Sequence, residues 1–202
     1  GVHDAGIRIG DLVVVFGLGV PGQIVAQAAR ASGATVVGVD PVKERREVAL
    51  KLGADRVLDP TAGSVAERIK SETGGRGADV CIEVPGAARA LAEAIRTVAY
   101  SSRVVAMGFF QGEARGLSLG EEFHHNRIEL ICSQISGVSP AASHRWNKPR
   151  LWQAAVRLQY EKRLNLLPLI THTVAFGEAP ALFARIDARQ PGMLQAVLTF
   201  AV

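Results

Sequence analysis

The chain has 202 residues, of which 48% are hydrophobic and 21% charged, and its formal net charge is +4. This length fits one domain, or one domain with a small appendage, and the apolar fraction is sufficient for a sizeable core. No uninterrupted apolar run reaches the roughly 18 residues of a transmembrane helix, the N-terminus lacks a signal-peptide pattern, and the scattered basic residues argue against nucleic-acid binding.

The two cysteines, Cys81 and Cys132, each stand inside an apolar, strand-like run. We expect both to be buried, inert thiols, since free cysteine behaves as a small hydrophobic residue. No C-x-x-C pair is present, and local spacing assembles no zinc site. Nothing in this cysteine usage requires an oxidising compartment, so we expect a cytoplasmic location.

The first predicted elements are a buried strand at Leu12–Phe16 and a helix over residues 24–30. Between them stand Gly17, Gly19 and Gly22 in the pattern G-x-G-x-x-G. A strand, this glycine motif and a helix in that order indicate dinucleotide binding. The glycines permit a sharp turn and close approach of a pyrophosphate, and the helix N-terminus offers free N–H groups with a partial positive charge.

A second predicted strand, Thr35–Val39, ends at Asp40, which lies 18 residues after Gly22. This spacing is close to the value of about 20 at which dinucleotide-binding folds place an acid on the adenosine ribose. A carboxylate there can accept hydrogen bonds from both ribose hydroxyls and repels a 2′-phosphate, which favours NAD over NADP. The alternative role for Asp40 is to cap the helix that follows.

The remaining chain alternates predicted helices and strands. Helices are expected at 42–52, 65–72, 87–99 and 149–163, and strands at 56–58, 78–84, 103–107 and 128–132. This alternation predicts an α/β fold with a parallel sheet and helices on both faces. A later strand, helix and strand at 171–176, 180–188 and 194–200 could extend that sheet or belong to a second domain.

Four segments in this order, residues 10–19, 51–55, 73–83 and 103–108, resemble the cofactor domain of the medium-chain dehydrogenase/reductase superfamily. The likeness is to the zinc-type alcohol and polyol dehydrogenases, and residues 164–202 are similar to the tail of that family. The resemblance implies a Rossmann doubly wound parallel sheet of six strands, plus a strand-helix-strand remnant of the catalytic domain. We expect an NAD-binding domain at 1–170 and a segment of the catalytic domain at 171–202.

The resemblance also implies the residues that contact the coenzyme. Beyond the three glycines they are Val20 and Pro21 at the pyrophosphate, Asp40 and Arg45 at the adenosine ribose, Val84 at the nicotinamide ribose, Met107, Gly108 and Phe109 beside the nicotinamide, and Ser133 and Ile135 at its carboxamide. These positions agree with the general rule that open α/β sheets bind ligands at the carboxyl ends of their strands.

Three departures from the family pattern bear on function. Pro21 has no N–H, so one backbone donor is missing. Gln195 stands where some relatives place a cation on the pyrophosphate. The catalytic zinc ligands and most of the substrate pocket belong to a domain that we expect to precede Gly1, so we assign no catalytic and no metal-binding residue within the chain.

The expected function is that of the NAD-binding portion of a zinc-type alcohol or polyol dehydrogenase, which transfers hydride between nicotinamide and a small alcohol or carbonyl compound. We expect a homodimer or homotetramer formed through the strand at 128–132, with no nucleic-acid or membrane partner. One alternative is a zinc-independent NAD(P)H-dependent quinone or enoyl reductase of the same superfamily. Another is a non-catalytic nucleotide-sensing module.

Three further features are candidates for metal-binding or catalytic sites. His124 and His125 are adjacent and point apart, so we interpret them as part of a polar loop rather than metal ligands. Tyr160 and Lys162 lack the spacing of the short-chain dehydrogenase pair. Glu83 ends the fourth strand, where a functional role and a local hydrogen-bonding role both remain open.

Overall fold

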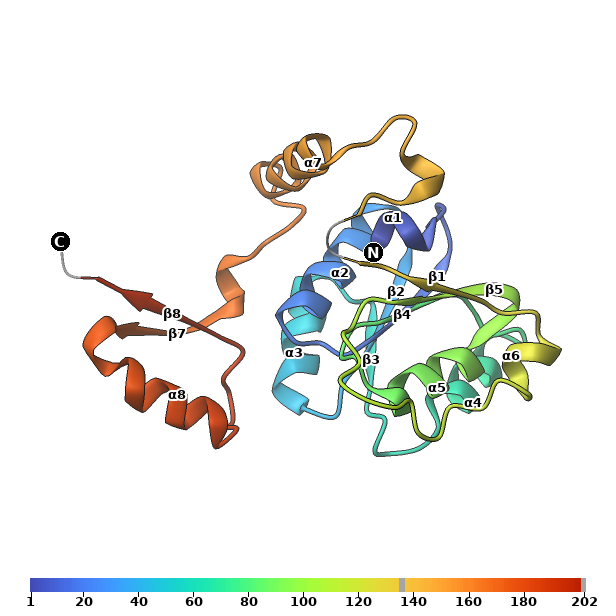
Figure 1. Ribbon diagram of the computed structural model, residues 1–202, viewed down its shortest axis with the longest axis horizontal. Coiled ribbons are helices and arrows are strands. Elements are labelled where there is room, and N and C mark those ends of the chain that lie inside the picture. Colours follow the sequence, from blue (N-terminus) through green and yellow to red (C-terminus); the bar gives the residue numbers. More distant parts are fainter. Residues whose placement is uncertain (135–136, 201–202) are drawn as a thin grey trace.

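The computed structural model describes residues 1–134 and 137–200. Its centre is a six-stranded sheet in the order β3-β2-β1-β4-β5-β6, with every neighbouring pair parallel (Figure 1). The strands are β1 Leu12–Phe16, β2 Thr35–Val39, β3 Arg56–Leu58, β4 Ala78–Glu83, β5 Val98–Ala106 and β6 Glu129–Cys132. The order reverses between β1 and β4, which makes this a doubly wound sheet. The predicted fold class is confirmed.

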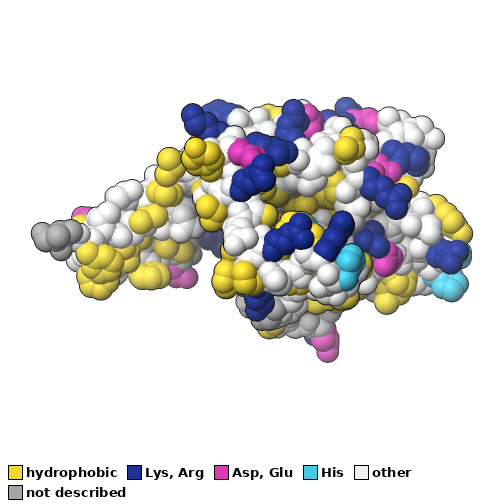
Figure 2. Space-filling model, turned by 90° about the horizontal axis from the view of Figure 1, so that it is seen from above, with side chains coloured by type: hydrophobic (Ala, Val, Ile, Leu, Met, Phe, Trp, Pro, Cys, Tyr) yellow, Lys and Arg dark blue, Asp and Glu magenta, His cyan; other side chains and the backbone are white. Residues whose placement is uncertain are grey.

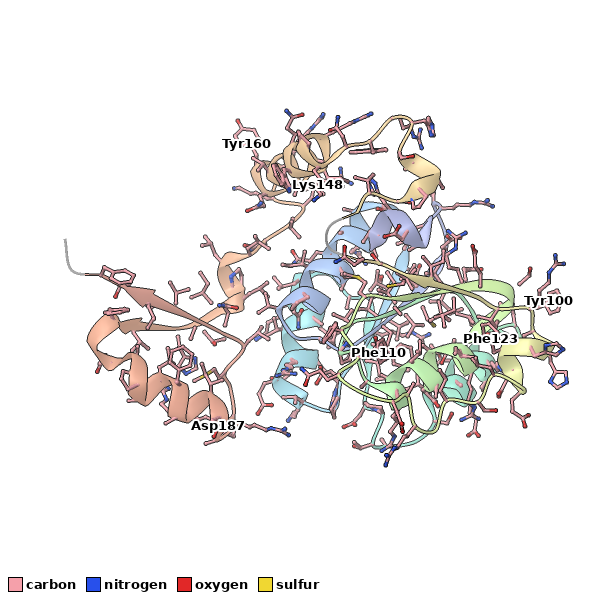
Figure 3. The ribbon with its side chains drawn as sticks, viewed as in Figure 1. Tyr100, Phe110, Phe123, Lys148, Tyr160 and Asp187 are labelled. Atoms are coloured by element: carbon pink, nitrogen blue, oxygen red, sulfur yellow. The ribbon has the colours of Figure 1, made fainter. Side chains whose placement is uncertain are left out.

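Helices cover both faces of the sheet. They are α1 Val2–Ala5, α2 Val20–Ala31, α3 Lys43–Leu52, α4 Val65–Glu72, α5 Ala88–Thr97 and α6 Glu122–His125. Because successive strand side chains point to opposite faces, Val13 and Val15 pack in the cluster that includes α2, while Val14 and Phe16 pack with α4 and α5. Phe110 and Phe123 pack at the periphery of the second cluster (Figure 3).

A smaller unit follows the sheet. It contains α7 Lys148–Tyr160, β7 Ile170–Ala175, α8 Ala179–Asp187 and β8 Gln195–Thr199, with 3₁₀ turns at Pro140–Ala142, Leu167–Leu169 and Phe176–Glu178. β7 and β8 form their own two-stranded parallel sheet, and α8 supplies the crossover that parallel strands require. Of the two arrangements left open by the sequence, the separate sheet is the one observed.

This unit extends to one side of the larger sheet (Figures 1 and 2), and few of its described side chains are buried. Its α7 has no buried residue, and Tyr160 points away from the molecule (Figure 3). Polar contacts connect this unit to the larger sheet. The buried Gln27 side chain of α2 accepts from the Asn165 N–H at 2.7 Å and donates to the Asn165 carbonyl at 3.2 Å, and the Arg163 guanidinium donates to the Ala31 carbonyl at 2.5 Å. Among the described residues, no helix has the length and hydropathy needed to cross a membrane.

The boundary between α5 and β5 differs from the prediction. The expected helix to residue 99 and strand from residue 103 are wrong, because α5 ends at Thr97 and β5 begins at Val98. Val98 is fully buried and pairs with Ala78 of β4, so tertiary packing overrides the apparent helical pattern. A register shift in this pairing and a positive φ of 56° at Ser101 accommodate the longer strand.

Two smaller expectations also fail at the β6 edge. The segment around His124 and His125, predicted as a loop, contains the one-turn helix α6, and Glu122 at its start pairs with Arg96 of α5. Cys132 is exposed rather than buried, because β6 ends the sheet order and has no neighbour on its outer side. Cys81, on the central strand β4, is buried as expected.

The polar connection at Gln27 is testable. Replacing Gln27 by Leu leaves the backbone groups of Asn165 without their protein partner. Because Asn165 is exposed and water can reach these groups, we expect a cost of about 1 kcal/mol. We expect faster amide hydrogen exchange across residues 163–175, with the exchange of β1 and β4 unchanged. Gln153→Leu, at an exposed position on α7, is the control. Unchanged exchange at 163–175 in the Gln27 variant would contradict the assigned connection.

Candidate functional site

The turn between β1 and α2 is shaped by backbone hydrogen bonds. Gly17 has a φ of +83°, a conformation that favours glycine, and its N–H donates to the Val39 carbonyl at 2.7 Å. Gly19 is the N-cap of α2 in an extended conformation, and its carbonyl accepts the N–H of Gln23 at 2.9 Å. The chain therefore reverses direction at the carboxyl end of β1 and enters α2 within a few residues.

The three glycines of this turn meet three different surroundings. A Cβ on Gly22 would lie 1.8 Å from the Gly17 carbonyl oxygen, so the helix packs on the turn backbone to backbone. A Cβ on Gly17 would lie 2.7 Å from the Cγ of Pro85, in the loop after β4. A Cβ on Gly19 would meet no atom within 4 Å. Two glycines thus allow packing within the protein, and Gly19 leaves open space in front of the helix.

The N-terminus of α2 borders this open space. The first N–H groups of any helix lack intrahelical carbonyl partners, and the aligned peptide dipoles favour an anion there. Val20 is half-buried and Pro21 is exposed, and Pro21 contributes no N–H. The predicted pyrophosphate residues therefore surround one helix terminus, with one donor fewer than the helix could offer.

Asp40 lies at the carboxyl end of β2 and is only 2% exposed. Its Oδ2 accepts the N–H of Leu18 at 2.7 Å, and its Oδ1 accepts the N–H of Val42 at 2.8 Å. The guanidinium of Arg45 lies 3.7 Å from Oδ2. Asp40 thus caps the following turn and also fixes the glycine turn. A carboxylate has about four acceptor positions, so two remain for other donors.

Gln23 is a buried member of this region that the sequence did not single out. Its Nε2 donates to the Leu18 carbonyl at 3.0 Å and to the Arg45 carbonyl at 2.8 Å. One side chain therefore joins the glycine turn to α3, next to Asp40. A signal was available, because Gln23 is a polar residue on the apolar face of a helix whose neighbours at that face are small and hydrophobic.

The predicted nicotinamide-side residues lie at the carboxyl ends of β4, β5 and β6. The N–H of Val84 donates to the Phe16 carbonyl, and Met107 is half-buried against the same cluster as Val13. Phe109 is 83% exposed. The hydroxyl of Ser133 donates to Asp4 of α1 at 2.6 Å. Ile135 lies outside the described residues.

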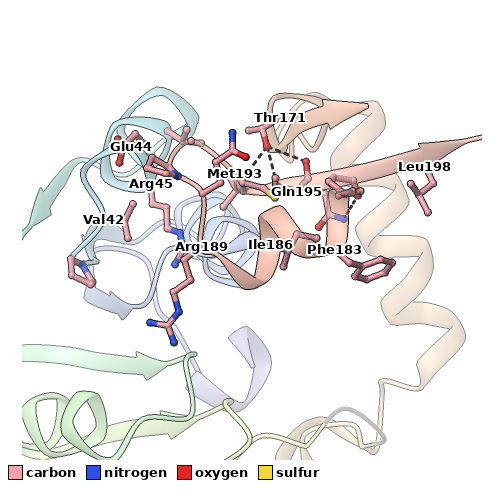
Figure 4. A pocket seen from close by; sticks show the side chains of 18 residues that line it. Val42, Glu44, Arg45, Thr171, Phe183, Ile186, Arg189, Met193, Gln195 and Leu198 are labelled. Atoms are coloured by element: carbon pink, nitrogen blue, oxygen red, sulfur yellow. Dashed lines mark hydrogen bonds between the residues drawn. The ribbon is translucent and has the colours of Figure 1, made fainter. Parts of the chain in front are cut away.

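A cavity of about 770 Å³ lies between α3 and the C-terminal unit (Figure 4). It is lined by Arg45 on the α3 side and by Gln195 of β8 on the other. The Gln195 amide group donates to the Ala196 carbonyl, and Thr171 accepts the backbone N–H groups of Leu194 and Gln195. The residue that departs from the family pattern therefore shares a cavity with the predicted ribose residue Arg45.

The described residues were also compared with the ligand sets that hold metal ions. Within the described ranges 1–134 and 137–200, no group of three His, Cys, Asp or Glu side chains could hold a metal ion. His124 and His125 have ring centroids 5.8 Å apart, and neither belongs to such a group. These residues therefore do not provide a zinc site.

A doubly wound sheet with a glycine turn, a helix N-terminus and an acid at its carboxyl edge defines the class of nucleotide-binding α/β domains. Residues 21–151 match a sequence model described as zinc-binding dehydrogenase. The chain therefore belongs to the zinc-binding dehydrogenases, within the medium-chain dehydrogenase/reductase superfamily that its motifs resemble.

Individual relatives agree with this assignment. D-guloside 3-dehydrogenase of Escherichia coli (strain K12) is 38% identical over 192 residues, which cover 95% of this chain and 55% of that protein. L-threonine 3-dehydrogenase of Pyrococcus abyssi is 33% identical over 169 residues, covering 83% and 45%. The chain spans about half the length of these curated relatives.

The fold is also seen in solved structures. The alcohol dehydrogenase TADH from Thermus sp. ATN1 superposes with a TM-score of 0.81 at 24% identity, covering 99% of this chain and 54% of that one. At this identity the likeness establishes the fold alone.

The different surroundings of the glycines predict different effects of one added methyl group. Gly22→Ala places Cβ against a backbone oxygen that cannot move freely, and we expect a loss of at least about 1–3 kcal/mol of unfolding free energy, as in overpacked cores. Gly19→Ala is the matched control: its φ of −64° suits alanine and its Cβ meets open space. Urea unfolding measures both variants, and equal destabilisation would contradict the assigned packing.

Proposed function

We propose that the chain is the coenzyme-binding portion of an NAD-dependent alcohol or polyol dehydrogenase of the zinc-type family. The main support for this proposal is the open space in front of Gly19 at the N-terminus of α2. At the other two glycines of the motif, Gly17 and Gly22, neighbouring atoms leave no room for a Cβ. The space would admit a pyrophosphate where any side chain would obstruct it. The activities named for the relatives, on a guloside and on threonine, support a hydroxyl compound as substrate.

In this proposal the chain's own residues bind and orient the coenzyme. The N-terminus of α2 stabilises the diphosphate charge, with Gly19 and Val20 nearest to it. Val84 and Met107 to Phe109 support the nicotinamide side, and Ser133 and Ile135 the carboxamide. A bound nicotinamide ring would supply the hydride acceptor.

The choice of NAD over NADP rests on Asp40. Its carboxylate is buried, keeps two acceptor positions free, and would face the adenosine ribose from the end of β2. A 2′-phosphate would meet this negative charge at close range. Arg45, at 3.7 Å, offsets part of the repulsion, and its side chain is 39% exposed, so it can move aside for the ribose.

We further propose a boundary at residues 170 and 171, between an NAD-binding domain and a segment of a catalytic domain. The separate sheet of β7 and β8, whose first strand begins at Ile170, supports this division. The proposed partner of the complete enzyme is a small alcohol or carbonyl compound rather than a nucleic acid or a membrane.

The exposed strand β6 supports two more parts of the proposal. It is at the end of the sheet order, and Leu130 on it is 37% exposed, which favours a homodimer or homotetramer through pairing with its twin. The free, exposed thiol of Cys132 on the same strand suits a reducing compartment, so we place the protein in the cytoplasm.

Coenzyme binding at the glycine turn is tested with Gly19→Ala. This variant is expected to fold like the wild type and to bind NADH at least about a hundredfold more weakly, since its methyl group occupies the diphosphate position and would displace the charge-assisted hydrogen bonds there. Calorimetric titration of both proteins with NADH measures the effect. Unchanged NADH affinity in the variant, or no NADH binding by the wild type, would overturn the proposal.

Coenzyme choice is tested with Asp40→Asn, which removes the charge and keeps one acceptor oxygen. Its amide NH₂ replaces the other acceptor, so one of the two turn hydrogen bonds is lost, and the thermal midpoint is measured alongside. We expect the NADH-over-NADPH preference to fall by about tenfold or more, equivalent to about 1.4 kcal/mol. Titrations with both coenzymes measure the ratio, and Asp59→Asn, at a carboxylate paired with Arg46, is the control. A wild-type preference for NADPH would instead favour the zinc-independent reductase alternative.

A further inference from the structure

Glu83 is a buried carboxylic acid at the centre of the sheet edge. It is the last residue of β4, where it pairs in register with Phe16 of β1 and with Ala106 of β5, and it is fully buried. Burying an ionisable group is costly unless hydrogen bonds compensate. Its Oε1 accepts the N–H of Ala87 at 2.9 Å, and within the described residues its buried Oε2 has no partner.

The loops above Glu83 touch each other directly. A Cβ on Gly108, in the loop after β5, would lie 1.9 Å from the Gly86 nitrogen in the loop after β4. A Cβ on Gly86 would lie 2.4 Å from the Phe109 carbonyl oxygen. Gly86 also has a φ of +70°, so glycine is favoured there both by this backbone conformation and by the lack of room for a Cβ. The two loops therefore form one backbone-to-backbone layer.

Glu83 contacts this layer on both sides. Its backbone carbonyl accepts the N–H of Met107 at 2.8 Å and of Gly108 at 3.3 Å, while its carboxyl group accepts from Ala87. Burial raises the pKa of the Glu83 carboxyl above its ordinary value, and the nearby N–H groups of Ala87, Gly86 and Gly108 oppose that rise. The carboxyl group thus accepts from the loop after β4, and the backbone carbonyl of the same residue accepts from the loop after β5.

We propose that Glu83 is a positioning residue for the nicotinamide side of the site: its carboxyl group fixes the loop after β4, which packs on the loop after β5, so that Val84 and Met107 to Phe109 contact the ring. This inference rests on the proposed function. Glu83 would act through these loops and would not touch the coenzyme. The distinction matters for the test, because a residue that merely caps α5 would affect stability without distinguishing one part of the coenzyme from another.

The experiment compares NADH with ADP-ribose, which shares the adenosine and diphosphate of NADH and lacks the nicotinamide. Glu83→Ala removes the carboxyl group, and Glu83→Gln keeps the shape and the acceptor for Ala87. We expect Glu83→Ala to weaken NADH by about tenfold or more and ADP-ribose by less than about twofold, with Glu83→Gln between the alanine variant and the wild type. Calorimetric titration measures both ligands, and the thermal midpoint reports folding.

Glu93→Ala is the matched control. Glu93 also accepts a helix N–H, that of Ala66 at 2.9 Å, and it bonds the Ser64 hydroxyl at the N-terminus of α4. Its loss should lower the thermal midpoint and leave the ratio of the two affinities unchanged. If Glu83→Ala does not fold, Glu83→Gln carries the test, with a reduced NADH-to-ADP-ribose affinity ratio as the expected result.

Two negative results are distinguishable. If the wild type binds neither NADH nor ADP-ribose, the proposed function fails and the inference falls with it. If the wild type binds both and the folded Glu83 variants shift the two affinities equally, or shift neither, the proposed function stands and the positioning role of Glu83 is overturned.

Discussion

The carboxyl edge of the sheet depends on close approach between backbones. The Gly17 carbonyl lies against Gly22, Gly17 lies against Pro85, and the loops carrying Gly86 and Gly108 lie against each other at distances that no Cβ could occupy. These contacts link the loops after β1, β4 and β5 into one continuous surface. Since only glycine permits them, the shape of this surface is set by where side chains are missing. Of the three glycines of the motif, Gly19 is the one at which a Cβ would meet no neighbouring atom.

Buried polar groups then fix the orientation of this surface. Asp40 accepts the Leu18 N–H, and Gln23 donates to the Leu18 carbonyl and to the Arg45 carbonyl. Leu18 is fully buried, and a Cβ on Gly38 of β2 would lie 3.0 Å from its side chain, so both its backbone and its side chain are held. Hydrogen bonds in such surroundings cost much when broken, which makes the turn stiff. A preformed turn spares a ligand the entropy of ordering it.

Much of this arrangement could be predicted, because the signals are local. The apolar run at Leu12–Phe16, the glycine spacing and Asp40 each act within a few residues, and the parallel sheet follows from alternation. The parts that could not be predicted depend on distant contacts. The start of β5 is decided by pairing of Val98 with Ala78, and the contact between Gly86 and Gly108 joins residues that the sequence gives no reason to associate. Gln23 gives a local signal, as a polar residue on an apolar helix face, but its partner, the Arg45 carbonyl, is a distant contact that the sequence does not reveal.

The glycine turn and the C-terminal unit differ in how firmly they are held. The helix α2, which follows the turn, is anchored in the core, since Val25, Ala26 and Ala29 are buried against the sheet. Gln195 of β8, which lines the cavity opposite α3, is an exposed residue of a two-stranded sheet. A neutral amide on a lightly held strand offers a phosphate less than a cation on a fixed one would. In the proposed complex, the α2 terminus would therefore supply most of the contacts to the diphosphate, although Pro21 removes one of its donors.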